Sequence, residues 1–343
     1  LKESELVGGK CPIHPSLSLE EIEEENYFFK FSKYQNKLLE YLDDKNVILP
    51  DWRRLEAIDF VKRGLDDFSI SRLKSRMSWG VGVPGDSEHV MYVWFDALTN
   101  YISTLDWPKE DGNFQDFWIE GKTIQLAGKD QIRFQSLMWQ AMLMSAGVLN
   151  TDKVVYHGFI TSGGQKMSKS LGNVIRPYDL INEYGTDAVR YFLLRHIHPF
   201  EDSDFTLERF KEIYTANLVN GLGNLVSRVM KMATTYEVRL KTKKDGMEFS
   251  PWEGGSHFED FRIDEFCNNI WNIISGLDEY VQKNEPFKTI KTDEARAKHD
   301  VHYLLRRLFG VAVSLSPIMP ETSEKIKSAI LNHQMPPPLF PRK

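Results

Sequence analysis

The stretch that decides the fold is residues 123–160, which read TIQLAGKDQIRFQSLMWQAMLMSAGVLNTDKVVYHGFI. Residues 123–127 and 154–160 are short runs rich in β-branched and aromatic side chains, and each run predicts a strand. Residues 131–146 between them predict a helix, which Gly147 ends. A strand, a helix and a second strand at this spacing form a βαβ unit, so we expect a parallel sheet in the middle of the chain.

The sequence on the two sides of this unit differs in character. Upstream, runs of aromatic and β-branched residues predict strands at 27–31, 78–83 and 89–95. Apolar periodicity predicts helices at 34–42 and 52–63. Downstream, amphipathic patterns predict helices at 208–232, 264–283, 294–316 and 321–331, with an aperiodic polar connection at 236–259. We therefore expect an α/β part followed by a separate α-helical bundle.

The composition excludes several classes of protein. The chain has 343 residues, of which 41% are hydrophobic and 27% are charged, and its formal net charge is −6. These values exclude a collagen, a disordered tail and a wholly basic surface for nucleic acid. No apolar run approaches the roughly 20 residues that span a bilayer, so we expect no membrane-embedded part. The only two cysteines, Cys11 and Cys267, exclude a disulfide scaffold and indicate a reducing compartment.

A lysine-rich loop follows the second strand of the βαβ unit. Residues 163–173 read GGQKMSKSLGN, so two glycines precede Lys166 and Lys169. Two ammonium groups on a loop with glycine hinges suit the charge that develops on a polyphosphate in a transition state. On composition alone, an exposed basic surface loop is the alternative interpretation.

A second candidate element stands where the strand 123–127 gives way to the helix. Gly128, Lys129, Asp130 and Gln131 follow the carboxyl end of that strand. Ligands of open α/β sheets bind at this edge, and a carboxylate there can accept hydrogen bonds from vicinal hydroxyls. The alternative role for Asp130 is a plain helix N-cap.

A third candidate element is aromatic. Trp94 and Tyr101 are seven residues apart, so on a helix they share one face, with the small Ala97 between them. Two rings on one face can enclose a flexible apolar side chain, and a thioether packs favourably against them. The alternative interpretation is an aromatic stripe that belongs to the hydrophobic core.

Residues 166–170 read KMSKS, which is the signature of class I aminoacyl-tRNA synthetases. The segments 23–30, 69–72 and 92–98 resemble the methionyl-tRNA synthetases of that class, and the similarity runs from about Gly8 to Arg342. The resemblance implies that Lys166 and Lys169 stabilise the triphosphate of ATP and the departing pyrophosphate while an amino-acid adenylate forms.

The resemblance also implies two substrate sites. It assigns ATP binding to Gly128, Asp130, Gln131, His157, Gly158, Met167, Ser168 and Ser170, with Asp130 in the element that holds the ribose. It assigns methionine binding to Trp94, Ala97, Tyr101, Phe134 and Gln135. Gln135 stands where the family usually has a histidine, and an amide can donate a hydrogen bond but cannot titrate.

An anticodon site is implied on the first helix of the bundle. Asn224 and Arg228 are four residues apart and share one helix face, which alone indicates an exposed polar pair. Amide and guanidinium edges read unstacked RNA bases, and the resemblance assigns both residues to the CAU anticodon. Pro286 and Phe287 match a Pro-Trp pair of the family, so here a phenyl ring would replace the stacking indole.

Cys11 and His14 form a Cys-x-x-His pair, which can supply two ligands of a tetrahedral zinc ion. A structural site needs four ligands, and Cys267 stands far away in the predicted bundle. The pair resembles half of the Cys3His zinc knuckle of some synthetases, and cysteines upstream of Leu1 would complete that knuckle. A turn without metal is the alternative.

The resemblance places the chain in the downstream part of such a synthetase. It implies the end of the connective insertion at 1–88, the second half of a Rossmann-type catalytic domain at 89–160, the lysine loop and stem-contact junction at 161–205 and an α-helical anticodon-binding domain at 206–343. The His-x-Gly-His element of class I enzymes and a starting methionine are absent from the sequence. We therefore expect the N-terminal part of the catalytic domain outside this chain, and an isolated chain that is incomplete for activity.

The implied activity is that of a methionine–tRNA ligase in the cytoplasm or in an organelle. Its substrates and partners would be L-methionine, ATP with Mg²⁺ and tRNA(Met). One alternative is a class I synthetase for cysteine, leucine, isoleucine or valine, against which the Trp94 to Tyr101 pocket and the Asn224 and Arg228 pair weigh. The other is a catalytically silent tRNA-binding fragment, which has no need of the lysine loop or of Asp130.

Overall fold

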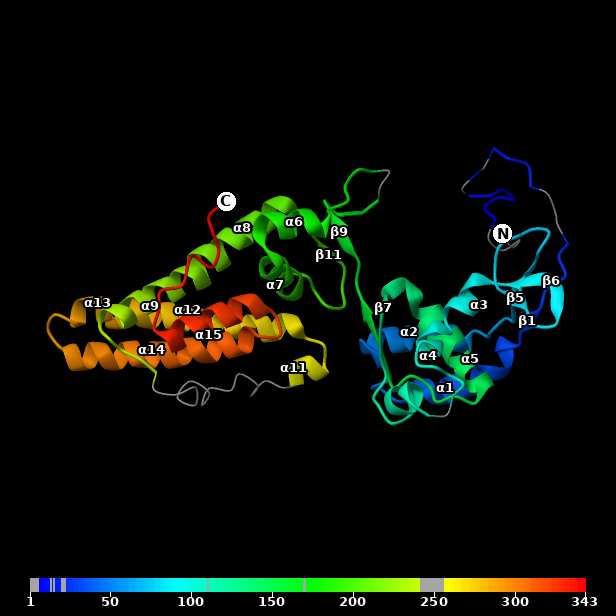
Figure 1. Cartoon of the computed structure of the whole chain (residues 1–343). Helices are drawn as coiled ribbons and strands as arrows, with labels where there is room; N and C mark the ends of the chain where they lie inside the picture. The colour runs from blue at the N-terminus through cyan, green and yellow to red at the C-terminus, as the bar shows by residue number, and fades with distance from the viewer. Residues whose placement is uncertain are drawn as a thin grey trace. The chain divides into compact units, whose positions relative to one another are not determined.

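The computed structural model describes residues 6–12, 14, 16–19, 23–109, 111–168, 171–240 and 256–343 (Figure 1). The chain divides into two compact units, Leu1–Tyr156 and His157–Lys343, and each is described by itself. Within the ranges above, every helix is too short or too polar to cross a membrane.

The first unit contains the predicted strand–helix–strand segment. Strands β2 (Ile48–Leu49), β8 (Lys153–His157) and β7 (Ile124–Gly128) form one sheet in the order β2–β8–β7. β2 and β8 are parallel, with Ile48 opposite Val154. Between β7 and β8 the chain forms a π-helical turn, η5 (Arg133–Met138), and helix α5 (Trp139–Ala146). Gly147 ends α5 in the left-handed conformation, with φ of +70°.

Two further helices of the first unit cover this core. α1 (Gln35–Asp43) and α2 (Asp51–Lys62) contact each other, as predicted for 34–42 and 52–63. Leu38 and Leu42 are one turn apart on α1 and are fully buried. Burying such a side chain contributes about 1.5–3 kcal/mol, so this face fixes α1 on the core.

Short antiparallel strands complete the first unit. β1 (Phe28–Phe29) pairs with β3 (Phe68–Ser69). A separate sheet has the order β4–β6–β5, formed by β4 (Ser71–Leu73), β6 (Asp86–Met91) and β5 (Gly82–Val83). The predicted strand at 27–31 is therefore shorter than expected, because residues Phe31–Tyr34 form the 3-10 turn η2.

The predicted strand at 89–95 is wrong beyond Met91. Residues Val93–Ala97 form helix α3, and Asn100–Ser103 form helix α4. The β-branched and aromatic side chains of this run favour a strand, but such preferences depend on what the side chains pack against. Here the ring of Trp94 lies 4.9 Å from that of Phe134, and these packing contacts require the helical turn.

The predicted strand at 154–160 is divided. β8 ends at His157, and β9 (Ile160–Ser162) joins a different sheet. Between them, a Cβ atom added to Gly158 would lie 2.1 Å from the backbone of Glu201. This close approach of two backbones requires glycine and lets the chain leave the first sheet.

The second unit begins with a small sheet in the order β10–β9–β11. β10 (Gln165–Lys166) is antiparallel to β9, and β11 (Ser203–Asp204) is parallel to it. Helices α6 (Pro177–Tyr184) and α7 (Thr186–His196) connect the strands and pack against each other.

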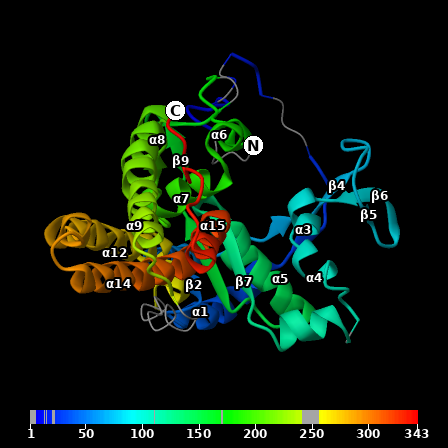
Figure 2. The same ribbon diagram turned by 60° about the vertical axis from the view of Figure 1, so that its left-hand side comes forward.

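The helical bundle follows in the same unit. A helix without interruption runs through α8 (Leu207–Ile213), the π-helical η6 (Tyr214–Gly223) and α9 (Asn224–Thr235). The later helices of the described chain are α11 (Ser256–Glu259), α12 (Ile263–Asn284), α13 (Pro286–Thr289), α14 (Glu294–Leu315) and α15 (Pro320–Asn332). α9, α12, α14 and α15 lie side by side in Figures 1 and 2 and enclose one core. The predicted bundle is confirmed, and residues 241–255 of the predicted connection lie outside the described residues.

Candidate functional site

The residues of the predicted methionine pocket lie on α3, α4 and η5 of the first unit. Trp94 of α3 stacks at a tilt of 34° on Phe134 of η5, and 39% of Trp94 is exposed. Tyr101 of α4 lies 5.8 Å from the buried ring of Trp139. Ala97 is the last residue of α3, so the predicted helix face is formed by two short helices.

Gln135 links this pocket to the core. Its side chain is only 5% exposed, and its Nε2 donates a hydrogen bond to the Tyr101 hydroxyl. The hydroxyl accepts this bond, so its own proton can be donated to another acceptor. The Gln135 Oε1 atom is buried and has no hydrogen-bond partner within the described residues. These residues therefore offer aromatic surfaces and one hydroxyl donor.

The carboxyl end of β7 carries the second predicted element. Gly128 ends the strand, and Lys129–Gln131 form the 3-10 turn η4. Asp130 is exposed, and one oxygen of its carboxylate accepts a hydrogen bond of 3.3 Å from Gln131 Nε2. An exposed carboxylate at this edge can accept hydrogen bonds from a diol.

The lysine loop of the second unit starts as a β-hairpin. Lys166 of β10 pairs with Thr161 of β9, and Gly163 and Gly164 form the turn with φ of +62° and +72°. The Lys166 ammonium lies 5.3 Å from the centre of the Phe159 ring, at cation–π distance. Gly163, Gly164 and Lys166 are exposed.

The far side of the loop is closed by Asn173. Its Oδ1 accepts a hydrogen bond of 2.9 Å from the Ser168 amide, and its Nδ2 donates one of 3.3 Å to the Lys166 carbonyl. Met167, predicted as an ATP contact, packs partly buried against the core of the second unit. The predicted residues Lys169 and Ser170 lie outside the described residues.

His157 and Gly158 precede this hairpin. The His157 side chain is exposed, and its Nδ1 donates a hydrogen bond of 2.9 Å to the Gly158 carbonyl. Together with the backbone of Glu201 beside Gly158, this bond shapes the entry of the chain into the hairpin.

A surface cavity of about 440 Å³ lies between α9, α12 and α13 in the second unit. Arg228, Lys231, Met232, Thr235, Tyr236, Val281 and Phe287 line it. Phe287 is 43% exposed, whereas Pro286 before it is buried as the first residue of α13. The exposed ring and the cations suit stacking on an unpaired base.

Arg228 is held at this cavity by α12. Its Nη1 donates to Asp278 Oδ1 at 2.6 Å, and Gln282 Nε2 donates to the other oxygen of Asp278 at 2.7 Å. The sequence interpretation missed Asp278 and also Lys231, although Lys231 follows Arg228 by three residues and so lies on the same helix face.

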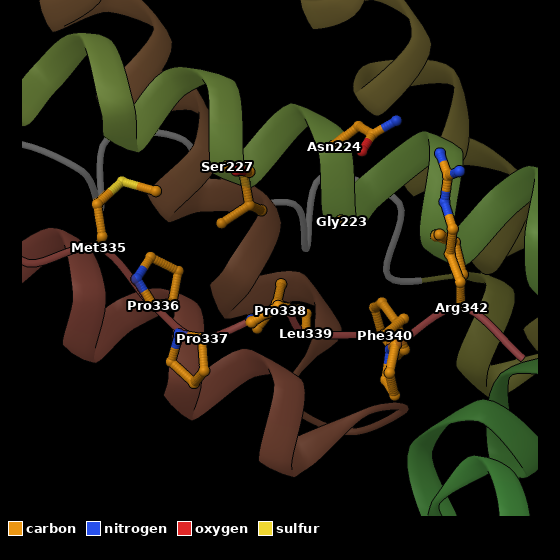
Figure 3. Close-up of a pocket in the computed structure, with 13 residues that line it drawn as sticks. Gly223, Asn224, Ser227, Met335, Pro336, Pro337, Pro338, Leu339, Phe340 and Arg342 are labelled. Carbon is orange, nitrogen blue, oxygen red and sulfur yellow. The ribbon is translucent and has the colours of Figure 1, made fainter.

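Asn224 faces a different hollow. A groove of about 600 Å³ separates η6 and α9 from residues 335–342, and Asn224 and Ser227 line it. Asn224 and Arg342 lie at one end of the groove and Met335 at the other (Figure 3). The structure thus places Asn224 and Arg228 on one helix but does not bring them to the same cavity.

The predicted zinc ligands are close together. Cys11 Sγ and His14 Nδ1 lie 3.9 Å apart. Across the described part of the chain, no three His, Cys, Asp or Glu residues form a group that could hold a metal ion. The residues present therefore supply two donors and do not by themselves complete a tetrahedral zinc site.

Comparisons with known proteins cover both units. The family described as "tRNA synthetases class I (M)" matches residues 1–230, and the "Anticodon binding domain of methionyl tRNA ligase" matches residues 255–338. A curated methionine–tRNA ligase of Fusobacterium nucleatum is 38% identical over 96% of this chain and 54% of its own length. That of Thermosynechococcus vestitus is 37% identical over 95% of this chain and 64% of its own length.

Solved structures agree with these matches. Methionyl-tRNA synthetase of Mycobacterium tuberculosis in complex with methionyl-adenylate superposes with a TM-score of 0.81 and 32% identity, over 94% of this chain and 68% of that one. The chain spans between half and two thirds of the length of the two curated relatives. The predicted fold class, part of a Rossmann-type catalytic domain followed by an α-helical anticodon-binding domain, is confirmed.

Proposed function

This chain belongs to the methionyl-tRNA synthetase family of class I, and from this premise we propose that it works as a methionine–tRNA ligase. In that reaction a carboxylate oxygen of methionine bonds to the α-phosphorus of ATP, and the bond to the β-phosphate oxygen breaks. Pyrophosphate leaves. A hydroxyl of the 3′-terminal ribose of tRNA(Met) then bonds to the methionyl carbonyl carbon, and the bond to the phosphate oxygen breaks to release AMP. The observation that carries the proposal is the contact of Trp94 with Phe134 beside the hydrogen bond from Gln135 to Tyr101.

The pocket supports methionine as the amino acid. The rings of Trp94, Phe134 and Tyr101 offer the polarizable contacts that a thioether prefers, and Ala97 leaves room beside them. The Tyr101 hydroxyl accepts from Gln135 and can donate its proton to sulfur, which is a weak acceptor. Leucine, isoleucine and valine have no such acceptor.

Each unit carries residues that we assign to ATP binding. Asp130 and Gln131 would accept and donate hydrogen bonds at the ribose, where Gly128 leaves room for the ligand. Lys166 and Lys169 would stabilise the charge on the leaving pyrophosphate, with the amides and hydroxyls of Ser168 and Ser170 beside them. His157 and Gly158 would position the start of this loop. The protein would contribute position and charge and need not form a covalent intermediate.

The second unit would bind the anticodon loop of tRNA(Met). A base stacked on Phe287 would meet the guanidinium of Arg228 in the cavity that both line. Asn224 would contact a neighbouring nucleotide from the groove that it lines. The buried Pro286 would fix the position of the Phe287 backbone at the start of α13. Phenylalanine lacks the indole N–H, so this contact rests on stacking alone.

Cys11 and His14 would supply half of a structural zinc site, and its two other ligands would come from outside the described residues. Zinc content measured by atomic emission, compared with that of Cys11→Ser, tests this assignment. We place the enzyme in the cytoplasm or an organelle, where tRNA is aminoacylated.

The experiment that tests the proposed function is ATP–pyrophosphate exchange with each of the amino acids methionine, cysteine, leucine, isoleucine and valine. The chain is assayed alone and together with the N-terminal half of the catalytic domain of the F. nucleatum relative. Exchange that depends on methionine in either arm supports the proposal. Dependence on another amino acid overturns it, and tRNA binding without exchange in both arms indicates a silent tRNA-binding protein.

A further inference from the structure

Asp204 lies at the base of the lysine hairpin. It ends β11 and stands opposite Thr161 of β9 in the parallel register. Two backbone bonds hold β11 in this place, from Ser203 to the Phe159 carbonyl at 3.0 Å and from Phe205 to the Thr161 carbonyl at 2.9 Å. The carboxylate is therefore fixed beside the strand that leads into the hairpin.

This carboxylate accepts two hydrogen bonds from the hairpin. The Gly164 amide donates to Asp204 Oδ1 at 2.8 Å, and the Thr161 hydroxyl donates to the same oxygen at 2.8 Å. Gly164 is the second residue of the turn, so the bond spans 40 residues to fix the point where the hairpin reverses. The Gly164 amide, followed by the Thr161 hydroxyl, holds the pKa of Asp204 below its usual range, and the group is charged at neutral pH.

The two glycines of the turn add no side-chain restraint of their own. Gly163 and Gly164 are exposed, have no side chains to pack and adopt positive φ, a region that glycine enters without steric cost. A turn of two glycines is free to change its angle unless another group fixes it. A carboxylate that receives hydrogen bonds is a stronger restraint than a neutral acceptor, because charge-assisted bonds are roughly twice as strong.

We propose that Asp204 is a positioning residue for adenylate formation, which fixes the Gly163–Gly164 turn so that Lys166 is held in place to meet the triphosphate. This role rests on the proposed function. Lys166 lies two residues after Gly164, so a change in the turn angle moves its ammonium directly. Asn173, which bonds to the Lys166 carbonyl and to the Ser168 amide, closes the other side of the same segment.

Three substitutions separate this role from a merely structural one. Asp204→Ala removes both acceptor oxygens, whereas Asp204→Asn keeps Oδ1 as a neutral acceptor and should restore part of the effect. Glu208→Ala is the matched control, because Glu208 is an exposed carboxylate of α8 in the same unit, away from the hairpin.

The first measurement is hydrogen–deuterium exchange of the intact protein, read on peptides over 160–168 and over α12 and α14. For Asp204→Ala we expect exchange of the hairpin amides to rise about 10-fold, with the bundle peptides unchanged. Unchanged hairpin exchange, or a rise across the whole unit, overturns the proposal. This result does not depend on activity, so it stands even where exchange of pyrophosphate shows the proposed function to be wrong.

The second measurement is methionine-dependent ATP–pyrophosphate exchange, with every variant assayed both alone and together with the N-terminal half of the catalytic domain of the F. nucleatum relative. For Asp204→Ala we expect kcat to fall about 10-fold or more, as for loss of a hydrogen bond to a charged group, with the KM for methionine within about 2-fold of wild type. The kcat of Asp204→Asn should lie between those of Asp204→Ala and wild type, and the kcat of Glu208→Ala should stay near wild type. A rise in the methionine KM with unchanged kcat overturns the proposal.

Discussion

The aromatic pocket and the lysine hairpin are held in place by different means. In the pocket, the ring of Trp94 packs against that of Phe134, and the ring of Tyr101 packs against that of Trp139. Gln135 is only 5% exposed. In the hairpin, Gly163 to Lys166 are exposed, and the turn is held by a hydrogen bond to Asp204. The first region is fixed by packing and the second by a few directional bonds.

The difference matches the role that we propose for each region. An amino acid is selected by a cavity whose shape exists before the ligand arrives, and close packing supplies that shape. The charge on a leaving pyrophosphate develops only during the reaction, so cations on a short hairpin can act on it when it appears. The comparison therefore predicts that changes in the pocket alter substrate affinity and that changes in the hairpin alter rate.

The largest expected effect is in the hairpin. For Lys166→Ala and for Lys169→Ala we expect kcat of adenylate formation to fall roughly 10²–10³-fold, since each removes a cation aimed at developing charge. Affinity for tRNA(Met) should change little. Lys211→Ala removes an exposed lysine from α8 of the same unit and should leave kcat near wild type. Near-normal exchange in both loop variants contradicts the phosphate role.

The second-largest expected effect is on tRNA affinity and concerns Phe287, which belongs neither to the pocket nor to the hairpin. For Phe287→Ala we expect affinity for tRNA(Met) to fall roughly 10- to 100-fold at fixed salt, because stacking on one base contributes about 1–3 kcal/mol. Phe287→Trp should bind at least as tightly as wild type. Phe117→Ala, which removes an exposed ring from the first unit, is the control for filter binding. If Phe287→Ala binds tRNA(Met) as tightly as wild type does, the assignment of Phe287 to the anticodon site is wrong.

A smaller effect is expected in the pocket. Tyr101→Phe removes the hydroxyl and leaves the buried Gln135 amide without its acceptor, at a cost of about 1–2 kcal/mol. The KM for methionine should rise roughly 5- to 30-fold with kcat largely kept. Tyr34→Phe, whose ring stacks on Phe29, is the matched control in the same unit. If Tyr101→Phe lowers kcat and leaves the KM for methionine unchanged, the Tyr101 hydroxyl has no role in selecting methionine.

The smallest effect concerns pH. Burial, with the charges of Arg195 and Arg209, lowers the pKa of His196 to about 4 from its usual 6.5. The unfolded chain therefore takes up this proton below about pH 6.5 while the folded chain does not, so stability should fall as the pH drops from 6.5 toward 4. Urea unfolding of His196→Gln should show a weaker pH dependence over this window. An equal dependence in the variant and the wild type contradicts the assignment.

The sequence allows the helix after β7 and the lysine loop to be predicted, because their signals are local. The periodicity of 131–146 and the glycine at 147 predict the helix after β7, and residues 163–173 identify the lysine loop directly. The strand expected at 93–95 is wrong. Its aromatic residues Trp94 and Phe95 pack against Phe134 and Phe29, and a local pattern does not show such packing partners.

What could not be predicted are contacts between distant residues. Asp204 reaches Gly164 across 40 positions, and Asp278 reaches Arg228 across 50. The spacing of Asn224 and Arg228 predicts a shared helix face correctly, but residues 335–342 and Phe287 place them in separate hollows. Such partners depend on how the helices pack, for which one sequence gives no periodic signal.

The most direct test of the division between pocket and hairpin is a methionine titration of ATP–pyrophosphate exchange at saturating MgATP, run side by side on wild type, Lys166→Ala and Tyr101→Phe. We expect Lys166→Ala to lose kcat by at least about 10²-fold with the methionine KM within about 3-fold of wild type. Tyr101→Phe should raise that KM with kcat largely kept. If both variants change kcat and KM in the same proportion, the two regions do not divide selection and catalysis between them.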